Sequence, residues 1–317
     1  MELKNKSIVV TGGLGFIGSH LVDKLIQENP ESLTVLGTLF IGKHNNIQKA
    51  KENFPDLKIE ELDITNYKEL KSSLTNINPD IVFHLATIPI PASLEKPMWS
   101  CDQNIQMSLN LCELARKDAY KTLIQYSTSE VYGTAREVPM KESHPIDPRT
   151  PYAASKAAAD HIAVSYHRTF GLDVSIPRPF NNYGPRQNAE KYAALIPATI
   201  KRMSNNEDVK ITGDGSQTRD FVYVNDTIDA TIKLAKSKIR GTPINISSGK
   251  ETSVKEIVQE LANLLDYKKE FIYEPSRPGD VKRHIGDSSK AKELLEFTPK
   301  VEIKEGLKNT VDWYKIA

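Results

Sequence analysis

Short apolar runs alternate with longer amphipathic segments through the first half of the chain, and this alternation restricts the fold more than any other feature. The apolar runs are rich in β-branched residues and lie at 7–11, 33–37, 57–62, 80–86 and 122–127. Helical patterns lie near 15–29, 44–52, 66–75, 98–118 and 152–170, and a further strand is predicted at 173–178. Continuous apolar strands linked by helices are typical of a parallel sheet covered on both faces. We therefore predict an α/β fold with a doubly wound parallel sheet.

A glycine-rich turn joins the first predicted strand to the first predicted helix. Gly12, Gly15 and Gly18 recur at three-residue spacing in IVVTGGLGFIGSHL (8–21). Glycine permits a tight turn there and lets backbone N–H groups approach a pyrophosphate at the helix N-terminus. Turn glycines alone would be a simpler interpretation, but the position at the start of a β-α-β series favours a dinucleotide. We predict a Rossmann sheet that binds NAD or NADP.

The end of the second strand bears on the choice between these cofactors. It reads VLGT (35–38), without the carboxylate that usually accepts the ribose 2′-hydroxyl of NAD, and Lys43 follows nearby. We expect NADP, with NAD as the alternative, although Lys43 could equally be a solvated loop residue. Asp63, after the third strand, could accept from an adenine amino group or cap the helix that begins near Asn66.

Five polar residues form a candidate catalytic group. Tyr152 and Lys156 lie four apart on one face of a predicted helix, and a nearby lysine helps a tyrosine act as a base. Thr128, Ser129 and Glu130 follow the fifth strand, at the edge where open parallel sheets bind ligands. Thr128 could bind the substrate hydroxyl that Tyr152 deprotonates, and Glu130 could act as an acid or base. Each residue taken singly is more often structural.

The chain changes character after Pro177, where proline and glycine break it into short pieces. We expect an NAD(P)-binding domain over 1–178, to which 220–248 return, and a smaller α/β substrate-binding lobe over 179–317, interleaved with the first. A strand is expected at 243–247, and helices at 252–266 and 303–315.

Several motifs occur together in one order. They are TGGLGFIGSHL (11–21), STSEVYG (127–133), YAASK (152–156), RPFNNYGPRQ (178–187), GDGSQTRDFVYVND (213–226) and RPGD (277–280). The chain resembles the extended short-chain dehydrogenase/reductase family of nucleotide-sugar epimerases and dehydratases over essentially all 317 residues. This resemblance implies that Thr128, Tyr152 and Lys156 are catalytic.

The resemblance also implies which residues contact the ligands. Those expected at the cofactor are Gly12, Gly15, Phe16, Ile17, Gly18, Thr38, Lys43, Asp63, Ile64, Leu85, Ala86, Thr87, Asn104, Tyr152 and Lys156. Those expected at the nucleotide sugar are Pro89, Asn181, Arg186, Leu195, Ile196, Arg219, Arg277 and Asp280.

The pair Ser129-Glu130 bears on the reaction. It is similar to the acid pair of 4,6-dehydratases, whereas 4-epimerases usually lack a carboxylate there. We expect a dehydratase acting on a UDP- or GDP-linked hexose such as N-acetylglucosamine, with Glu130 as base at C5 and acid toward the C6 hydroxyl. Ser129 stands where the best-known dehydratases have Asp. The sequence therefore leaves open an enzyme that stops at an alkene and one that inverts C5.

Three other enzyme classes remain alternatives. UDP-glucuronate decarboxylases carry the same Thr-Ser-Glu, and an epimerase acting at C4 or C5 is also possible. A 4-keto-sugar reductase using NADPH is less favoured because it needs no acid at position 130. The apolar LATIPIPAS (85–93) should line the sugar pocket, which disfavours a glucuronate carboxylate unless Arg178, Arg186, Arg219 or Arg277 reaches it. A binding-only protein would be expected to lack one of the catalytic residues.

Composition limits the partners. The net charge of +1 argues against binding to nucleic acid or to an anionic membrane. Cys101 and Cys112 form no CxxC pair, so we expect neither a metal nor a disulfide framework. The N-terminus has no signal-peptide pattern and no apolar stretch approaches ~18 residues, so a cytoplasmic protein is expected. By resemblance, the helices at 98–118 and 152–170 would form a four-helix bundle in a homodimer or higher oligomer, or else simply pack on the sheet.

Overall fold

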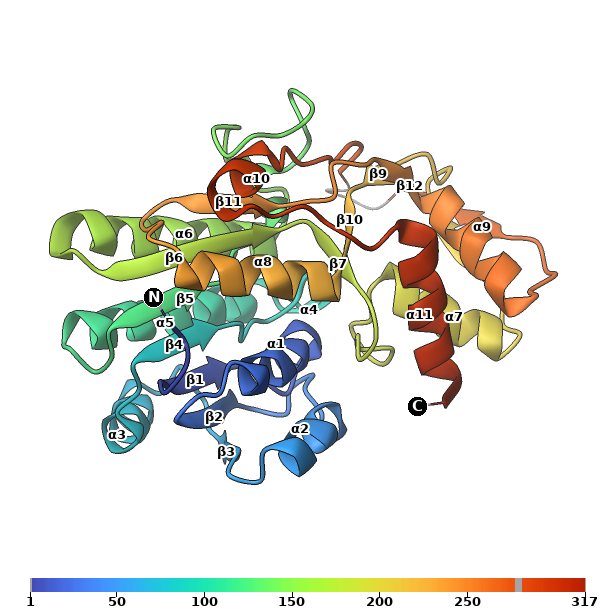
Figure 1. Ribbon diagram of the computed structural model, residues 1–317. Coiled ribbons are helices and arrows are strands. Elements are labelled where there is room, and N and C mark those ends of the chain that lie inside the picture. Colours follow the sequence, from blue (N-terminus) through green and yellow to red (C-terminus); the bar gives the residue numbers. More distant parts are fainter. Residues whose placement is uncertain (1, 277–280, 317) are drawn as a thin grey trace.

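A seven-stranded parallel sheet forms the centre of the computed structural model, which describes residues 2–276 and 281–316 (Figure 1). The strands in spatial order are β11 (Pro243–Ile246), β6 (Asp173–Pro179), β5 (Thr122–Gln125), β4 (Ile81–His84), β1 (Ser7–Thr11), β2 (Ser32–Gly37) and β3 (Lys58–Glu61). Every neighbouring pair is parallel; Ile8 of β1, for example, lies opposite Leu33 and Ile81. This sheet confirms the predicted doubly wound α/β fold.

Helices cover both faces of the sheet, which explains why β1 and β4 are buried along their whole length. One face packs against α1 (Phe16–Gln27), α2 (Gln48–Asn53) and α8 (Val224–Lys236). The other packs against α3 (Tyr67–Ile77), α5 (Pro97–Arg116) and α6 (Pro151–Phe170). No helix in the described ranges is long and apolar enough to cross a membrane.

The region near 44–52 differs from the single helix predicted. A 3-10 turn (His44–Ile47) precedes α2 there. Ile47 is buried in the core with φ of −120°, so helical geometry is interrupted and restarts at Gln48.

A smaller lobe lies at the right of Figure 1, around α7, α9 and α11. It has a hydrophobic core of its own. Its helices are α7 (Leu195–Ser204), α9 (Val254–Leu265) and α11 (Ile303–Ile316). Its strand pairs are β7 (Asn181–Tyr183) with β10 (Phe221–Tyr223), β8 (Lys210–Thr212) with β13 (Ile272–Glu274), and β9 (Thr218–Arg219) with β12 (Thr252–Ser253). The remaining helical elements are α4 (Ile90–Glu95), α10 (Ser289–Leu295) and a 3-10 turn, η2 (Ser129–Tyr132).

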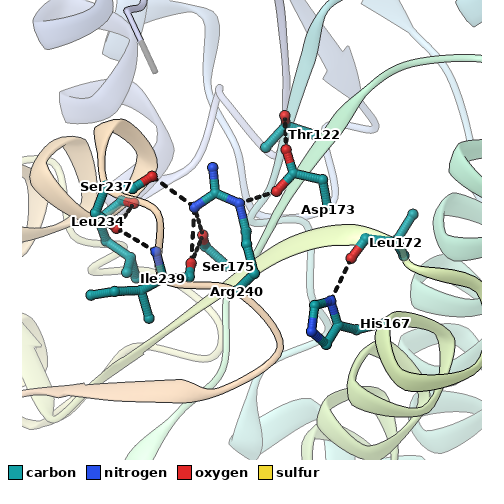
Figure 2. Close-up of polar contacts among 9 residues, drawn as sticks. All are labelled: Thr122, His167, Leu172, Asp173, Ser175, Leu234, Ser237, Ile239 and Arg240. Atoms are coloured by element: carbon teal, nitrogen blue, oxygen red, sulfur yellow. Dashed lines mark hydrogen bonds and ion pairs between the residues drawn. The ribbon is translucent and has the colours of Figure 1, made fainter.

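The chain returns from this lobe to the large sheet through α8 and β11, and Arg240 holds the return in place (Figure 2). Its guanidinium pairs with the carboxylate of Asp173 and donates to Ser175 Oγ at 3.0 Å and to the carbonyl of Ile239 at 2.9 Å. Thr122 donates to the same carboxylate at 2.8 Å. These contacts lie at the starts of β5 and β6, so the opposite ends of the strands are left to form the site.

Candidate active site

A cavity of about 450 Å³ lies beyond the carboxyl ends of β1, β2, β4, β5 and β6, where open parallel sheets bind ligands. Its wall combines both lobes. The lining segments are the turn and helix start at 12–18, the stretches 36–42, 85–91, 126–130 and 179–182, the helix residues Tyr152 and Lys156, and parts of 187–196 with Phe221.

The glycine turn fits the pyrophosphate of a dinucleotide. Gly12 has φ of +71°, and a Cβ there would lie 2.7 Å from the backbone nitrogen of Ala86. A Cβ on Gly18 would lie 2.2 Å from the Gly12 carbonyl oxygen, so glycine lets α1 pack directly on the turn. Gly15 is the N-cap residue of α1, and no side chain caps the helix there. Gly15, Phe16 and Ile17 all line the cavity. Unpaired N–H groups at a helix start bind phosphate well.

Tyr152 and Lys156 enter the cavity from the first turns of α6. That helix begins here because Thr150 accepts a hydrogen bond from the backbone N–H of Ala153 at 3.2 Å and Pro151 occupies the first position. The Lys156 ammonium is buried and donates to the Tyr126 carbonyl at 2.5 Å. Burial lowers the pKa of Lys156 to about 8. The negative charge of Asp160 raises this pKa and so limits the decrease.

Thr128 and Glu130 lie beside the Tyr152 phenol. Burial raises the pKa of Tyr152 first of all, the Glu130 charge raises it further, and hydrogen bonds to Thr128 and Thr87 oppose both. A cationic nicotinamide would lower that pKa toward the working range. The cavity therefore holds two separate groups able to move protons, a phenol and a carboxyl.

The turn η2 positions Ser129 and Glu130. Thr128 Oγ1 accepts from the backbone N–H of Glu130 at 3.3 Å, which caps the turn. Ser129 is buried and its carbonyl oxygen lies 3.1 Å from His284 Nε2. Ser129 and Glu130 both line the cavity.

Most of the residues singled out from the sequence meet in this cavity. Those lining it are Gly12, Gly15, Phe16, Ile17, Gly18, Thr38, Leu85, Ala86, Thr87, Pro89, Thr128, Ser129, Glu130, Tyr152, Lys156, Asn181, Leu195 and Ile196. Among the lining residues that the structure describes, Lys156 is the only cation and Glu130 the only acid.

Asn104 is one of several predicted residues that do not line the cavity. Its amide oxygen accepts from the backbone N–H of Ile88 at 2.7 Å, and its amide nitrogen donates to Ser155 Oγ at 3.0 Å. Asn104 thus holds the 87–88 loop against α6 and shapes the cavity from behind. Ile64 is buried in the core. Lys43 is an exposed residue that directly precedes the 3-10 turn.

Two arginines and Asp63 also lie outside the lining. Arg186 pairs with Asp23 of α1 at 2.7 Å. Arg219 Nη1 donates to the carbonyl oxygen of Val281 at 2.6 Å. Asp63 Oδ1 accepts from the backbone N–H of Thr65 at 2.9 Å, within the turn before α3. The remaining two predicted residues, Arg277 and Asp280, lie outside the described part of the chain.

Sequence reasoning missed an ion pair behind Lys156. Asp160, one turn further along α6, pairs with Arg178 of β6 at 2.7 Å, and both side chains are buried. The i, i+4 spacing from Lys156 was a signal for Asp160. Phe40 and Tyr192, which also line the cavity, had no such signal. The described residues contain no group of His, Cys, Asp or Glu side chains placed to bind a metal ion.

Comparisons with known proteins agree with this geometry. The chain matches the GDP-mannose 4,6 dehydratase family over residues 9–310. It is 37% identical to a UDP-glucuronate 4-epimerase of Thermodesulfobacterium geofontis, over 97% of this chain and 95% of that protein.

Two solved structures are also similar. One is the UDP-glucose 4-epimerase of Thermotoga maritima with UDP-glucose, at 35% identity and a TM-score of 0.91, covering 97% of this chain and 98% of that one. The other is a dTDP-glucose 4,6-dehydratase of Streptomyces venezuelae with NAD bound, at 31% identity and a TM-score of 0.92, covering 97% and 96%. The chain belongs to the extended short-chain dehydrogenase/reductase family of nucleotide-sugar epimerases and dehydratases.

Proposed function

We propose that this enzyme oxidises C4 of a neutral nucleotide-linked hexose and then eliminates water across C5 and C6. The observation that carries the proposal is the Glu130 carboxyl, which lines the same cavity as Tyr152 and is close enough to raise the pKa of the phenol. A reaction confined to C4 needs one proton-transfer group, whereas elimination needs a second one near C5 and C6. A UDP- or GDP-linked hexose such as N-acetylglucosamine fits this chemistry.

The proposed proton transfers give each of these side chains one role. Tyr152 Oη, oriented by Thr128, accepts the proton of the sugar 4-hydroxyl, and the Lys156 charge stabilises the phenolate. A nicotinamide dinucleotide, held by the glycine turn, would supply the hydride acceptor for C4. Glu130 then removes the C5 proton, which the new C4 ketone makes acidic. The resulting carboxylic acid protonates the leaving C6 hydroxyl, and water departs. Return of the hydride to C6 would then be balanced by a proton to C5, equal to the one that Tyr152 took from the 4-hydroxyl, and would leave a 4-keto-6-deoxy sugar.

The charge of the cavity supports a neutral sugar. Lys156 is the only lining cation among the described residues, and in the proposed reaction its charge stabilises the Tyr152 phenolate. Arg178 is engaged by Asp160 behind the cavity, and Arg186 by Asp23 on α1. Within residues 2–276 and 281–316, a glucuronate carboxylate would therefore find no lining counter-ion besides Lys156, which makes decarboxylation of UDP-glucuronate a weaker candidate.

A 4-epimerase is the second candidate, because two of the similar proteins described above carry that name. Thr128, Tyr152 and Lys156 would suffice for it, since rotation of a 4-keto intermediate needs no proton transfer at C5. Glu130 would then have no chemical role.

A panel of UDP-, GDP-, CDP- and dTDP-linked hexoses and UDP-glucuronate, analysed by mass spectrometry, separates these reactions. Loss of 18 Da, the mass of water, supports dehydration; loss of carbon dioxide supports a decarboxylase, and an unchanged mass with a new sugar configuration supports an epimerase. Glu130→Gln should abolish water loss while a single turnover still reduces the nicotinamide. Water release at the unaltered rate in that variant would refute the role of Glu130.

Tyr152→Phe should block the first step. Without the phenolate the 4-hydroxyl keeps its proton, so no reduced-nicotinamide absorbance should appear in a single turnover. Thr87→Val is the matched control, because it keeps the phenol and removes only the Thr87 hydroxyl, which hydrogen-bonds to Tyr152 and donates to Asn104 Oδ1 at 3.2 Å. Reduction at the normal rate in Tyr152→Phe would point to another base.

We propose NADP as the cofactor, held by residues 1–178 with 220–248, while the rest of 179–317 holds the nucleotide sugar. β2 ends in Gly37 without a carboxylate, which leaves room for a 2′-phosphate. The nearest acid in register with Gly37 is Glu61, whose carboxylate lies 3.1 Å from His44 Nε2. Tighter binding of NAD than of NADP in a fluorescence titration would refute this choice.

We further propose a homodimer formed through α5 and α6. These two helices pack against each other along one side of the sheet. Light scattering should report twice the mass of 35.5 kDa or a higher multiple of it. A monomer at micromolar concentration would refute the proposal.

A further inference from the structure

Three aromatic side chains from different parts of the chain meet at a partly exposed edge of the cavity, which we call its mouth. With Glu95 they form what we call the aromatic bridge. Phe40 follows β2, Trp99 lies at the start of α5, and Tyr192 precedes α7 in the other lobe. The Phe40 and Tyr192 rings are stacked with centroids 5.7 Å apart, and the Phe40 and Trp99 rings are 5.5 Å apart. Phe40 and Tyr192 also line the cavity. The bridge therefore spans from the sheet side of the cavity to the smaller lobe.

Tyr192 is held in an unfavourable backbone conformation by contacts across the mouth. Its φ is +71°, a left-handed value that bulky residues rarely adopt. Its hydroxyl donates to Glu95 Oε2 at 2.8 Å, and Lys191 pairs with the other oxygen of the same carboxylate at 3.2 Å. The stack on Phe40 and the hydrogen bond to Glu95 both act on this residue. Strain of this kind is typical of ligand clamps.

The bridge lies on the side of the cavity that fits the dinucleotide. Phe40 is three residues beyond Gly37, and the backbone N–H of Lys43 donates to the Leu14 carbonyl at 3.0 Å. The 38–43 segment is thus tied to the glycine turn that fits the pyrophosphate. A dinucleotide reaching from the end of β2 to Tyr152 would pass this segment, on whose Phe40 the Tyr192 ring of the other lobe is stacked.

We infer that the aromatic bridge closes the cavity over the nicotinamide dinucleotide and sets the rate at which this cofactor leaves. Departure requires the Phe40 and Tyr192 rings to separate and the Glu95 hydrogen bond to break. Retention of the cofactor matters for a reaction in which the reduced cofactor must return its hydride to the sugar. If the reduced form left before that step, the keto sugar could not be converted to product. The inference depends on dinucleotide binding and not on whether the later chemistry is dehydration or epimerisation.

The test measures cofactor release directly. Full-length protein loaded with NADH, and in a parallel experiment with NADPH, is mixed with a large excess of the oxidised form, and the nicotinamide fluorescence is followed. Phe40→Ala and Tyr192→Ala should each raise the dissociation rate about tenfold, the factor that corresponds to about 1.4 kcal/mol. Because each change breaks the same stack, the double variant should release cofactor little faster than either single variant.

Two further variants separate the bridge from a general loosening of the protein. Tyr192→Phe keeps the stack and loses the Glu95 hydrogen bond, so its rate should rise by a smaller factor of about three. Tyr273→Ala alters an exposed aromatic residue of β13, outside the bridge and outside α5 and α6, and should leave the rate unchanged.

Two outcomes would overturn the inference. One is an unchanged nicotinamide release rate in Phe40→Ala and Tyr192→Ala that melt at the normal temperature. The other is an equal or larger rise in the release of UDP from the loaded protein, which would assign the bridge to the substrate. Failure to detect dehydration in the sugar panel would leave these rates measurable, so the two proposals can fail separately.

Discussion

Replacing Asp160 with asparagine should strongly destabilise the protein, because it leaves a buried arginine without its counter-ion. The Asp160 and Arg178 side chains are only 8% and 3% exposed, and Arg178 Nη2 lies 2.7 Å from Asp160 Oδ2. Ser127 donates to the same oxygen at 2.5 Å, and Arg178 also donates to Tyr132 Oη at 2.7 Å. An asparagine at this position would keep the size of the side chain while removing the charge.

The magnitude follows from this geometry. Two unit charges about 4 Å apart at an effective dielectric of about 20 attract by about 4 kcal/mol. Measured losses on removing one member of a buried pair are about 3–5 kcal/mol, which agrees. At about 2 °C per kcal/mol for a chain of this size, the melting temperature should fall by about 6–10 °C.

Thermal unfolding followed by circular dichroism at pH 7, without added cofactor, measures the change. The double variant Asp160→Leu with Arg178→Met removes both charges and should recover most of the loss. Glu302→Gln, which breaks the exposed pair with Lys250, is the matched control and should shift the melting temperature by less than about 2 °C. A fall of under about 2 °C in Asp160→Asn would refute the reasoning, since the buried charge would then need no partner.

Two other changes test the glycine turn and the buried histidines. Gly18→Ala should lower the melting temperature by several degrees, because its Cβ would lie 2.2 Å from the Gly12 carbonyl and overpacking costs about 1–3 kcal/mol. Gly15→Ala, whose Cβ has only that carbonyl nearby at 3.2 Å, should melt normally but bind NADP at least about tenfold more weakly in a fluorescence titration; equal melting of the two variants would contradict this contrast. Burial lowers the pKa of His84 to about 3 and that of His20 to about 4, so below pH ~6.5 the unfolded chain takes up protons first. Stability should therefore fall as the pH drops from 6.5 toward 4, by about 2 kcal/mol per histidine at pH 5, and His84→Gln should have a shallower pH profile; equal slopes would contradict the assignment.

The local pattern of the sequence was enough to predict the sheet and the central part of the site. β1 reads SIVVT because both faces of the sheet are covered, and continuous burial requires a continuous apolar run. Gly12, Gly15 and Gly18 share one turn, and Tyr152 and Lys156 share one helix face. In each case the relevant residues are close in the chain, so spacing alone determines their relative positions.

Only the tertiary structure showed which distant residues meet. Asn104 carries no local sign that it holds the 87–88 loop, and Arg178 none that it pairs with Asp160 rather than with a substrate. Phe40 and Tyr192 are far apart in sequence and are neighbours only because the two lobes line one cavity. A side chain's partner across the fold depends on how whole elements pack, and that packing is a sum over many residues that no short motif contains.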